Sequence, residues 1–410
     1  MKTSKTLYIF SLYTPIEQAE SFLKNEIDLW LKEANINIIV VPTRLTKKKY
    51  SDIPEFVDIS LSNLLLSRKK TKLLLLINPL NLIKCIRHTP RKHRLKINAY
   101  REVFDALVEQ VITRKWLKNL NLLETESLFY SFWLNNIILS SADFFKNTNT
   151  SVISRTHRFD LYEETQKYNF FPFREKLISN LDLLIPASKN AEIYLTKKYG
   201  SKVQILLKKL GVEIPKDILL NNPNDNDTKT IVSCSVMKKV KRVELIAERL
   251  VIFCINNPSM NINWIHFGKG ELEPNIMKIL KNKPINLKFK IHDFTPNSTL
   301  LTFYKQNWID AFINLSSSEG QPVSIMEVMA HGIPCIATDT GGVSELINEN
   351  TGILLNIHHK PEHFNNALLK IIGQISFNRL KIRDYIKDNN SLENQFLSIK
   401  TIVNNFYQNI

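Results

Sequence analysis

The chain has 410 residues, of which 44% are hydrophobic and 23% are charged, and its formal net charge is +16. This composition excludes a disordered, collagen-like or coiled-coil protein, and the length predicts two or three domains of about 150 residues each. The apolar runs are far shorter than the roughly 20 residues that cross a bilayer, and the N-terminus lacks the pattern of a cleaved signal peptide. Four widely spaced cysteines favour neither a zinc site nor disulfides, so we expect a cytoplasmic protein.

The first half of the chain predicts strands and helices in alternation, with long insertions between them. The predicted strands are residues 7–12, 36–41, 152–154 and 183–185, and the predicted helices are residues 17–34 and 188–199. The polar stretch 213–229, which contains proline and several asparagines, is typical of a linker.

The second half repeats the alternation at shorter intervals. Buried strands are expected at residues 231–236, 262–267, 309–315 and 333–337, and amphipathic helices at 243–253 and 323–330. Strands that alternate with helices run parallel, with right-handed crossovers, in a doubly wound sheet. We therefore predict an α/β protein of two Rossmann-like domains facing a cleft: residues 1–212, residues 213–388, and a C-terminal helix in 389–410 that packs back toward the first domain.

Positive charge concentrates between Arg44 and Lys96, where 14 Lys or Arg face three acidic residues. Leucine and isoleucine separate the basic clusters and aromatic residues are few, which argues against nucleic-acid binding. An anionic membrane surface suits this segment better, since each basic residue near such a surface contributes about 1 kcal/mol. The competing interpretation is a solvated, lysine-rich face.

Glycine is concentrated in the C-terminal half, where eight of the ten glycines lie at or beyond Gly268. Glycine allows the backbone to approach a ligand closely, so a phosphate-binding loop is expected there. The predicted strand 309–315 leads into a loop and then a helix that begins near Pro322. Ligands of open α/β sheets bind beyond the carboxyl ends of strands, and a helix N-terminus attracts anions. Glu319 in the loop and Glu327 on the helix are candidates for binding hydroxyl groups.

The stretch SSSEGQPVSIMEVMAHGIPCIATDTGGVSELI, residues 316–347, closely resembles the donor-binding core of the GT-B glycosyltransferases of family 4, also called glycosyltransferase group 1. Glu319 and Glu327 match the two glutamates of that family's E-x7-E pattern. The resemblance implies that Glu327 binds the ribose of a nucleotide and that Glu319 contacts the transferred sugar. It also implies a sugar and phosphate site lined by Gly320, Gln321, Pro322, Val323 and Ser324.

A second match lies at residues 233–243, SCSVMKKVKRV, which resemble the strand, loop and helix start that bind the donor diphosphate. Lys241 matches the phosphate-binding lysine of the family, and Gly268 matches the turn after the next strand. The arginine that the family commonly has five residues before this lysine is Val236 here, and Lys238 or Lys239 are candidates to replace its charge.

In the N-terminal half, the segments 20–27, 130–133 and 154–162 resemble polysaccharide-biosynthesis members of the family. His157 falls where members place a histidine near the donor sugar. The loop 13–15 lacks the glycines that are usual there.

The resemblance implies a retaining glycosyltransferase that moves a hexose-type sugar from a nucleotide-sugar donor to a glycan acceptor, with Lys241, Glu319 and His157 as catalytic residues. It implies no metal and no cofactor besides the donor. The expected acceptor is a lipid-linked precursor of a surface polysaccharide, reached from the inner face of the cytoplasmic membrane. Two alternatives stay open: a GT-B epimerase or phosphorylase, and a non-catalytic GT-B-like subunit that partners another glycosyltransferase.

Overall fold

A computed structural model of the chain describes residues 4–14, 21–44, 53–120, 122, 125–223, 227–374 and 377–408. It divides into two compact units, Met1–Lys208 with Phe396–Ile410, and Lys209–Gln395. The first crossing between the units thus falls four residues before the expected boundary after residue 212. Lys47, Lys48, Lys49 and Glu20, which the sequence patterns include, lie outside the described residues.

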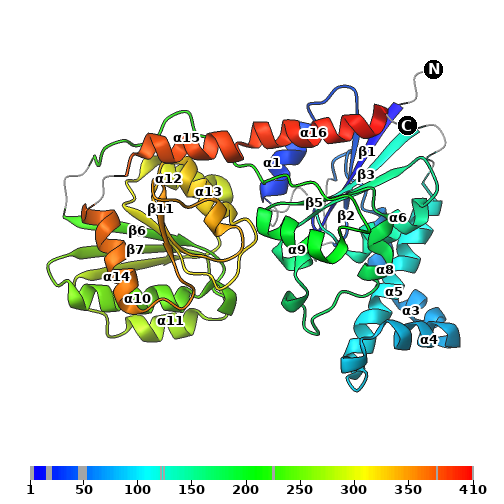
Figure 1. The fold of residues 1–410 in the computed structure, drawn as a ribbon, viewed down its shortest axis with the longest axis horizontal. Helices are drawn as coiled ribbons and strands as arrows, with labels where there is room; N and C mark the ends of the chain where they lie inside the picture. Colours follow the sequence, from blue (N-terminus) through cyan, green and yellow to red (C-terminus); the bar gives the residue numbers. More distant parts are fainter. Residues whose placement is uncertain are drawn as a thin grey trace. The chain divides into compact units, whose positions relative to one another are not determined.

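The first unit is a five-stranded parallel sheet of order β2-β1-β3-β4-β5 with helices on both faces (Figure 1). Its elements are β1 Ser4–Ser11, α1 Ser21–Trp30, β2 Asn37–Pro42, α2 Ser60–Leu66, α3 Lys69–Ile77, α4 Pro79–His88, α5 Ile97–Lys118, β3 Thr125–Ser131, α6 Asn136–Phe145, β4 Ser151–Thr156, α7 Arg158–Leu161, α8 Arg174–Leu177, β5 Leu183–Pro186 and α9 Lys189–Tyr199.

Side chains on both faces of the first sheet are buried. Tyr8 and Phe10 of β1 belong to the core cluster that contains residues of α5 and α6. Leu7 and Ile9, which point to the opposite face because strand side chains alternate, are fully buried as well. Burial on both faces explains why β1 is a continuous apolar run rather than an alternating one.

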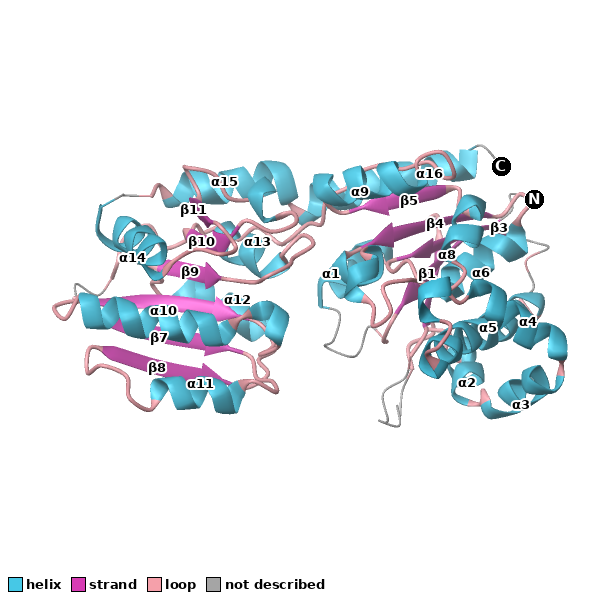
Figure 2. Ribbon diagram, turned by 60° about the horizontal axis from the view of Figure 1, so that its bottom comes forward, coloured by secondary structure: helices cyan, strands magenta, loops and turns pink. Residues whose placement is uncertain are grey.

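The second unit is a six-stranded parallel sheet of order β11-β10-β9-β6-β7-β8 (Figure 2). Its elements are β6 Thr228–Cys234, α10 Val243–Asn256, β7 Asn261–Phe267, α11 Glu273–Leu280, β8 Leu287–His292, α12 Asn297–Gln306, β9 Ala311–Asn314, α13 Val323–Ala330, β10 Cys335–Thr338, β11 Gly352–Leu355, α14 Pro361–Leu369 and α15 Arg379–Asn390. Two doubly wound α/β units confirm the predicted fold class.

The chain crosses between the units twice, at residues 209–212 and along the last helix, α16 Leu392–Gln408. Within the second unit the two segments are joined, since Val212 N donates to Asn390 O at 2.9 Å and Leu392 N donates to Val212 O at 2.9 Å. In the first unit, α16 packs on α1 through Phe396, whose ring lies 4.9 Å from that of Trp30.

Candidate functional site

The predicted site residues of the second unit lie in the loops at the carboxyl ends of its strands and in helix α13, which follows one of these loops. Open parallel sheets bind ligands at this edge. The loop after β9 contacts the loop after β6, because Ser317 N donates to Val240 O at 2.8 Å. The loops after β6 and β7 also meet, since Ser235 N donates to Phe267 O at 3.0 Å. Segments that are far apart in the sequence therefore form one loop cluster.

Lys241 and Glu319 form an ion pair within this cluster. The Nζ of Lys241 donates to Oε1 of Glu319 at 2.6 Å, and Nδ2 of Asn314 donates to the same oxygen at 3.3 Å. The Glu319 side chain is only 7% exposed, whereas that of Lys241 is 30% exposed. The carboxylate is thus held from two sides, while the ammonium, which has three N–H donors, still reaches solvent.

The loop after β10 closes over the backbone of Glu319. Gly342 N donates to Gly320 O at 2.8 Å. Gly341 has a φ of +57°, and a Cβ at this position would lie 1.9 Å from the carbonyl oxygen of Glu319. Only glycine satisfies both conditions, so the expected turn at these glycines is also a close contact with the loop that holds Glu319.

Helix α13 begins immediately after this loop, with Pro322 as its N-cap residue. Its first turn contains no acidic side chain, so the positive end of the helix dipole is not neutralised there. The backbone amides of Val323 and Ser324 open the helix and have no partner within it. Gln321 has a structural contact, because its Oε1 accepts from Leu210 N at 2.6 Å.

Glu327 lies in the second turn of α13 and is mostly buried. Asn297, the first residue of α12, donates from Nδ2 to Oε1 of Glu327 at 2.8 Å. Burial raises the pKa of Glu327 to about 7; the hydrogen bond from Asn297 lowers the pKa, and the nearby charge of Glu213 raises it. The carboxyl group therefore changes protonation near neutral pH.

Gly268 follows β7 with a φ of +122°, and a Cβ there would lie 2.3 Å from Ser235 O, in the loop after β6. Glycine is thus required where these two loops touch. Val236, at the position of the family's missing arginine, is exposed, as are Lys238 and Lys239. All three lie in the loop that leads to Lys241.

Sequence reasoning missed three residues that shape this site: Asn297, Asn314 and Arg242. Arg242 has a φ of +48°, donates from Nη1 to Ile357 O at 2.9 Å, and donates from Nε to Leu315 O. A polar residue that ends a buried strand is a signal that could have indicated Asn314. Nothing in the sequence indicates Asn297, because it meets Glu327 only through the packing of α12 near α13.

His157 lies in the first unit, directly after β4. Its ring stacks on Phe132 at 4.7 Å between centroids and meets Trp133 edge-on at 5.0 Å. Burial, together with the charge of Arg155, lowers the pKa of His157 to about 3, so the imidazole is neutral at physiological pH. A neutral imidazole can donate one hydrogen bond and accept another, but it has no second proton to give as a general acid.

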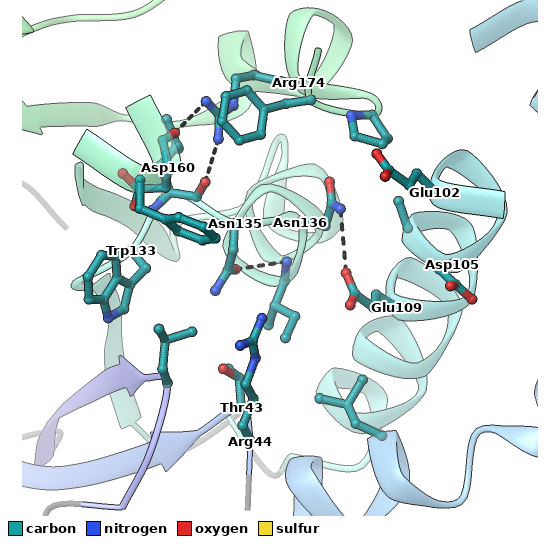
Figure 3. A pocket seen from close by; sticks show the side chains of 18 of the residues that line it. Thr43, Arg44, Glu102, Asp105, Glu109, Trp133, Asn135, Asn136, Asp160 and Arg174 are labelled. Atoms are coloured by element: carbon teal, nitrogen blue, oxygen red, sulfur yellow. Dashed lines mark hydrogen bonds between the residues drawn. The ribbon is translucent and has the colours of Figure 1, made fainter. Parts of the chain in front are cut away.

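The first unit also contains a cavity of about 830 Å³ at the carboxyl ends of β1 to β4 (Figure 3). Basic and acidic side chains both line it, among them Arg44, Glu102 and Glu109. Nδ2 of Asn136 donates to Oε2 of Glu109 at 3.4 Å, and burial raises the pKa of this glutamate. Carboxylates and amides in a cavity of this size suit a ligand rich in hydroxyl groups.

Asp160 and Arg174 fix the loops around this cavity. The Asp160 carboxylate accepts from Leu134 N at 2.6 Å and from His157 N at 2.6 Å. Arg174 donates to Leu134 O at 2.6 Å and to the carbonyl oxygen of Asp160. Burial raises the pKa of Asp160 to about 6, against the lowering effect of Arg174.

The described part of the chain contains no group of three or more His, Cys, Asp or Glu side chains placed to hold a metal ion. Within the same ranges, no helix combines the length and the apolar composition that crossing a bilayer requires.

The part of the second unit that contains the loop cluster matches a known protein family. Residues 217–390 match the family described as Glycosyl transferases group 1. This segment, somewhat less than half of the chain, is thus similar to the group 1 glycosyltransferases. The match covers Lys241, Glu319 and Glu327 and confirms the resemblance at the level of the group; assignment to family 4 stays a prediction.

Two curated relatives are each 24% identical to the chain. The alpha-monoglucosyldiacylglycerol synthase of Acholeplasma laidlawii matches over 219 residues, 50% of this chain and 49% of that protein. The amylovoran biosynthesis glycosyltransferase AmsK of Erwinia amylovora matches over 228 residues, 55% of this chain and 53% of that protein. The chain thus spans about half the length of the curated relatives it matches.

Solved structures extend the likeness to both units. The apo lipopolysaccharide outer core galactosyltransferase WaaB has a TM-score of 0.66 at 14% identity, and the likeness covers 99% of this chain and 100% of that one. The pneumococcal O-GlcNAc transferase GtfA, in complex with UDP and GlcNAc, has a TM-score of 0.58 at 15% identity and covers 73% of this chain and 60% of that one. The fold of the chain is therefore GT-B.

Proposed function

We propose that this chain is a retaining glycosyltransferase that moves a hexose-type sugar from a nucleotide-sugar donor to a glycan acceptor. The observation that carries the proposal is the ion pair of Lys241 and Glu319 beside the N-terminus of α13. A solvent-reaching cation and an unneutralised helix dipole suit an anionic group, and a fixed carboxylate suits hydroxyl groups. A nucleotide sugar has a diphosphate and a polyhydroxylated ring side by side.

In the proposed donor complex, Lys241 donates to the diphosphate with the N–H groups that Glu319 does not use. The amides of Val323 and Ser324 donate to the same anionic group. Glu319 accepts hydrogen bonds from hydroxyls of the transferred sugar, and the ionised form of Glu327 accepts from the two ribose hydroxyls.

In the proposed reaction, the bond between the anomeric carbon and the diphosphate oxygen breaks, and an acceptor hydroxyl oxygen forms the new bond on the same face of that carbon. The acceptor proton passes to the departing diphosphate, so the products are a glycoside and a nucleoside diphosphate. Lys241 and the N-terminus of α13 stabilise the negative charge that develops on the leaving group. We expect this reaction to proceed without a metal.

The cavity of the first unit supports a glycan as acceptor, because its lining of carboxylates and amides suits hydroxyl groups. The names of the two curated relatives, an alpha-monoglucosyldiacylglycerol synthase and an amylovoran biosynthesis glycosyltransferase, support a lipid-linked precursor of a surface polysaccharide. On this proposal the enzyme is cytoplasmic and works at the inner face of the cytoplasmic membrane.

The test is a transfer assay with a panel of nucleotide sugars and a lipid-linked oligosaccharide, with the product analysed by NMR spectroscopy. We expect the new linkage to have the anomeric configuration of the donor and turnover to persist in EDTA. An inverted product contradicts the retaining reaction. Loss of turnover in EDTA that magnesium restores contradicts the metal-free one.

A further inference from the structure

The segment 66–97 of the first unit exposes an unusual amount of apolar surface. Of the 24 large hydrophobic side chains that are exposed among the described residues, eleven lie in this segment. Single exposed leucines are ordinary, but a concentration of them marks an interaction surface.

Helices α3 and α4 carry most of this surface. No side chain of α3 is buried, and its Leu74 and Ile77 are 69% and 72% exposed. In α4 only Asn81 and Cys85 are buried: Asn81 donates from Nδ2 to Leu75 O of α3 at 3.1 Å, and Cys85 belongs to the core cluster that contains residues of α5. Ile83 is among the exposed residues. The two helices extend from the end of α5 away from the sheet, side by side in both views (Figures 1 and 2). We call residues 69–88 the apolar hairpin.

The charged residues of the apolar hairpin and of the segments that flank it in sequence are all basic. Residues 59–101 contain no Asp or Glu and eleven Lys or Arg. Lys69, Lys70, Lys84 and Arg87 of the hairpin itself are exposed. Lys72 differs, because it pairs with Asp105 of α5 and so fixes α3 to the rest of the unit.

Apolar side chains interleaved with unpaired cations match one surface chemistry, the headgroup region of an anionic bilayer. Acyl chains accommodate the leucines and isoleucines, and lipid phosphates balance the cations. A nucleic acid is a poorer match, because residues 57–99 contain no Phe, Tyr or Trp on which bases could stack. A purely apolar protein partner would leave the basic side chains without counter-charges.

We infer that the apolar hairpin docks this chain on an anionic lipid surface, with its leucine and isoleucine side chains below the level of the lipid phosphates. The cavity of the first unit is lined in part by Leu65, Leu66 and Arg68, which directly precede α3. A bilayer at the hairpin therefore brings lipid-anchored acceptors to the mouth of this cavity. This last step rests on the proposed function, whereas the docking itself does not.

The experiment is co-sedimentation of the full chain with vesicles of phosphatidylcholine alone or mixed equally with phosphatidylglycerol, at low and high salt. An apolar variant combines Leu74→Ser, Ile77→Ser and Ile83→Ser. Its matched control combines Leu220→Ser, Ile255→Ser and Ile285→Ser, which are exposed side chains of the second unit. A basic variant replaces Lys69, Lys70, Lys84 and Arg87 with Gln.

We expect the wild type and the control variant to bind the mixed vesicles and to bind phosphatidylcholine far more weakly. The basic variant should lose at least tenfold in affinity at low salt, and little at high salt, where screening has already weakened the ionic contribution. The apolar variant should lose at least tenfold at either salt concentration. Absence of wild-type binding to the mixed vesicles, or wild-type affinity in the apolar variant, overturns the inference.

Insertion and self-association are separated by two further readouts. A tryptophan introduced by Ile77→Trp should add emission that lipids brominated on their acyl chains quench, and no quenching of that added emission overturns insertion. If light scattering instead finds a dimer that the apolar variant abolishes, and vesicles do not bind, the surface joins two copies of the chain and the inference is wrong.

Failure of docking is distinguishable from failure of the proposed function. Nucleotide affinity and transfer to a water-soluble acceptor should be the same in the apolar variant and the wild type. Vesicle binding without nucleotide binding leaves the docking inference standing and removes the proposed transferase.

Discussion

If Glu327 binds the ribose of the donor, as proposed, the affinity for a nucleotide should depend on pH. Two ribose hydroxyls can both donate to this side chain only when its carboxyl group is ionised. Burial raises its pKa to about 7, so protons compete with the nucleotide near neutral pH. Because binding favours the ionised form, affinity should be highest above pH 7 and fall as the pH is lowered through 7.

The magnitude follows from the same pKa. With a pKa of about 7 in the free protein, about nine-tenths of the Glu327 carboxyl groups are ionised at pH 8 and about one-tenth at pH 6. The dissociation constant of a nucleotide sugar should therefore rise about tenfold between these pH values, which equals about 1.4 kcal/mol of binding free energy.

The assay is isothermal titration with a nucleotide sugar, whose diphosphate keeps its charge over this range, at pH 6, 7 and 8. The control is Glu327→Gln, which keeps the shape of the side chain but cannot ionise. This variant should bind the nucleotide sugar more weakly, and its affinity should not change between pH 6 and 8. Equal wild-type affinity at pH 6 and 8, or the same pH dependence of affinity in Glu327→Gln as in the wild type, would refute the assigned role of Glu327.

Three further predictions concern catalysis and stability. Lys241→Ala should lower kcat about 10²–10³-fold and also lower the melting temperature, since the mostly buried Glu319 carboxylate loses its ion pair; wild-type turnover would contradict the role of Lys241 at the leaving group. Gly341→Ala should destabilise the second unit by at least about 1–2 kcal/mol, since φ is +57° and Glu319 O lies in the way. Gly373→Ala, with nothing within 4 Å of its Cβ, is the control, and equal melting temperatures in the two variants contradict the close contact. Arg155→Met should cost about 3–5 kcal/mol in denaturant unfolding, because it leaves the buried Glu26 carboxylate without its 3.1 Å ion pair; a change under about 1 kcal/mol contradicts that account.

Sequence periodicity predicts the positions of several helices and strands of the second unit. The predicted helix at residues 323–330 coincides with α13, and the predicted strand at residues 262–267 differs from β7 by one residue. These elements are short, largely buried and bounded by turn residues, so their apolar periodicity and the flanking turns indicate the same limits.

The sequence predicts the first unit less well, because the segments that we propose to carry its function lie in insertions between its strands. Positive charge indicated a membrane surface over residues 44–96, but the sequence does not show which apolar side chains remain exposed. That distinction depends on tertiary packing, which buries Asn81 and Cys85 of α4 and leaves Ile83 in solvent. The pairing of Lys72 with Asp105 likewise has no local signal, since 33 residues separate the two.

For the site itself, residue types and spacing indicated the candidates, whereas their partners had to come from the fold. The family pattern includes Glu319 and Glu327, but Asn314 and Asn297, which hold their carboxyl groups, belong to other elements. The pKa of Glu327 depends on burial by surrounding elements and therefore could not be predicted from the sequence.

The most direct test of the central claim, a nucleotide-sugar donor site in the second unit, is calorimetric titration of the chain with UDP, GDP, ADP and CMP in the absence of metal. We predict that one of the four binds clearly better than the others and that Lys241→Ala weakens this binding. If none of the four binds to the folded chain, the donor site is contradicted, and the chain is better explained as a non-catalytic partner of another glycosyltransferase.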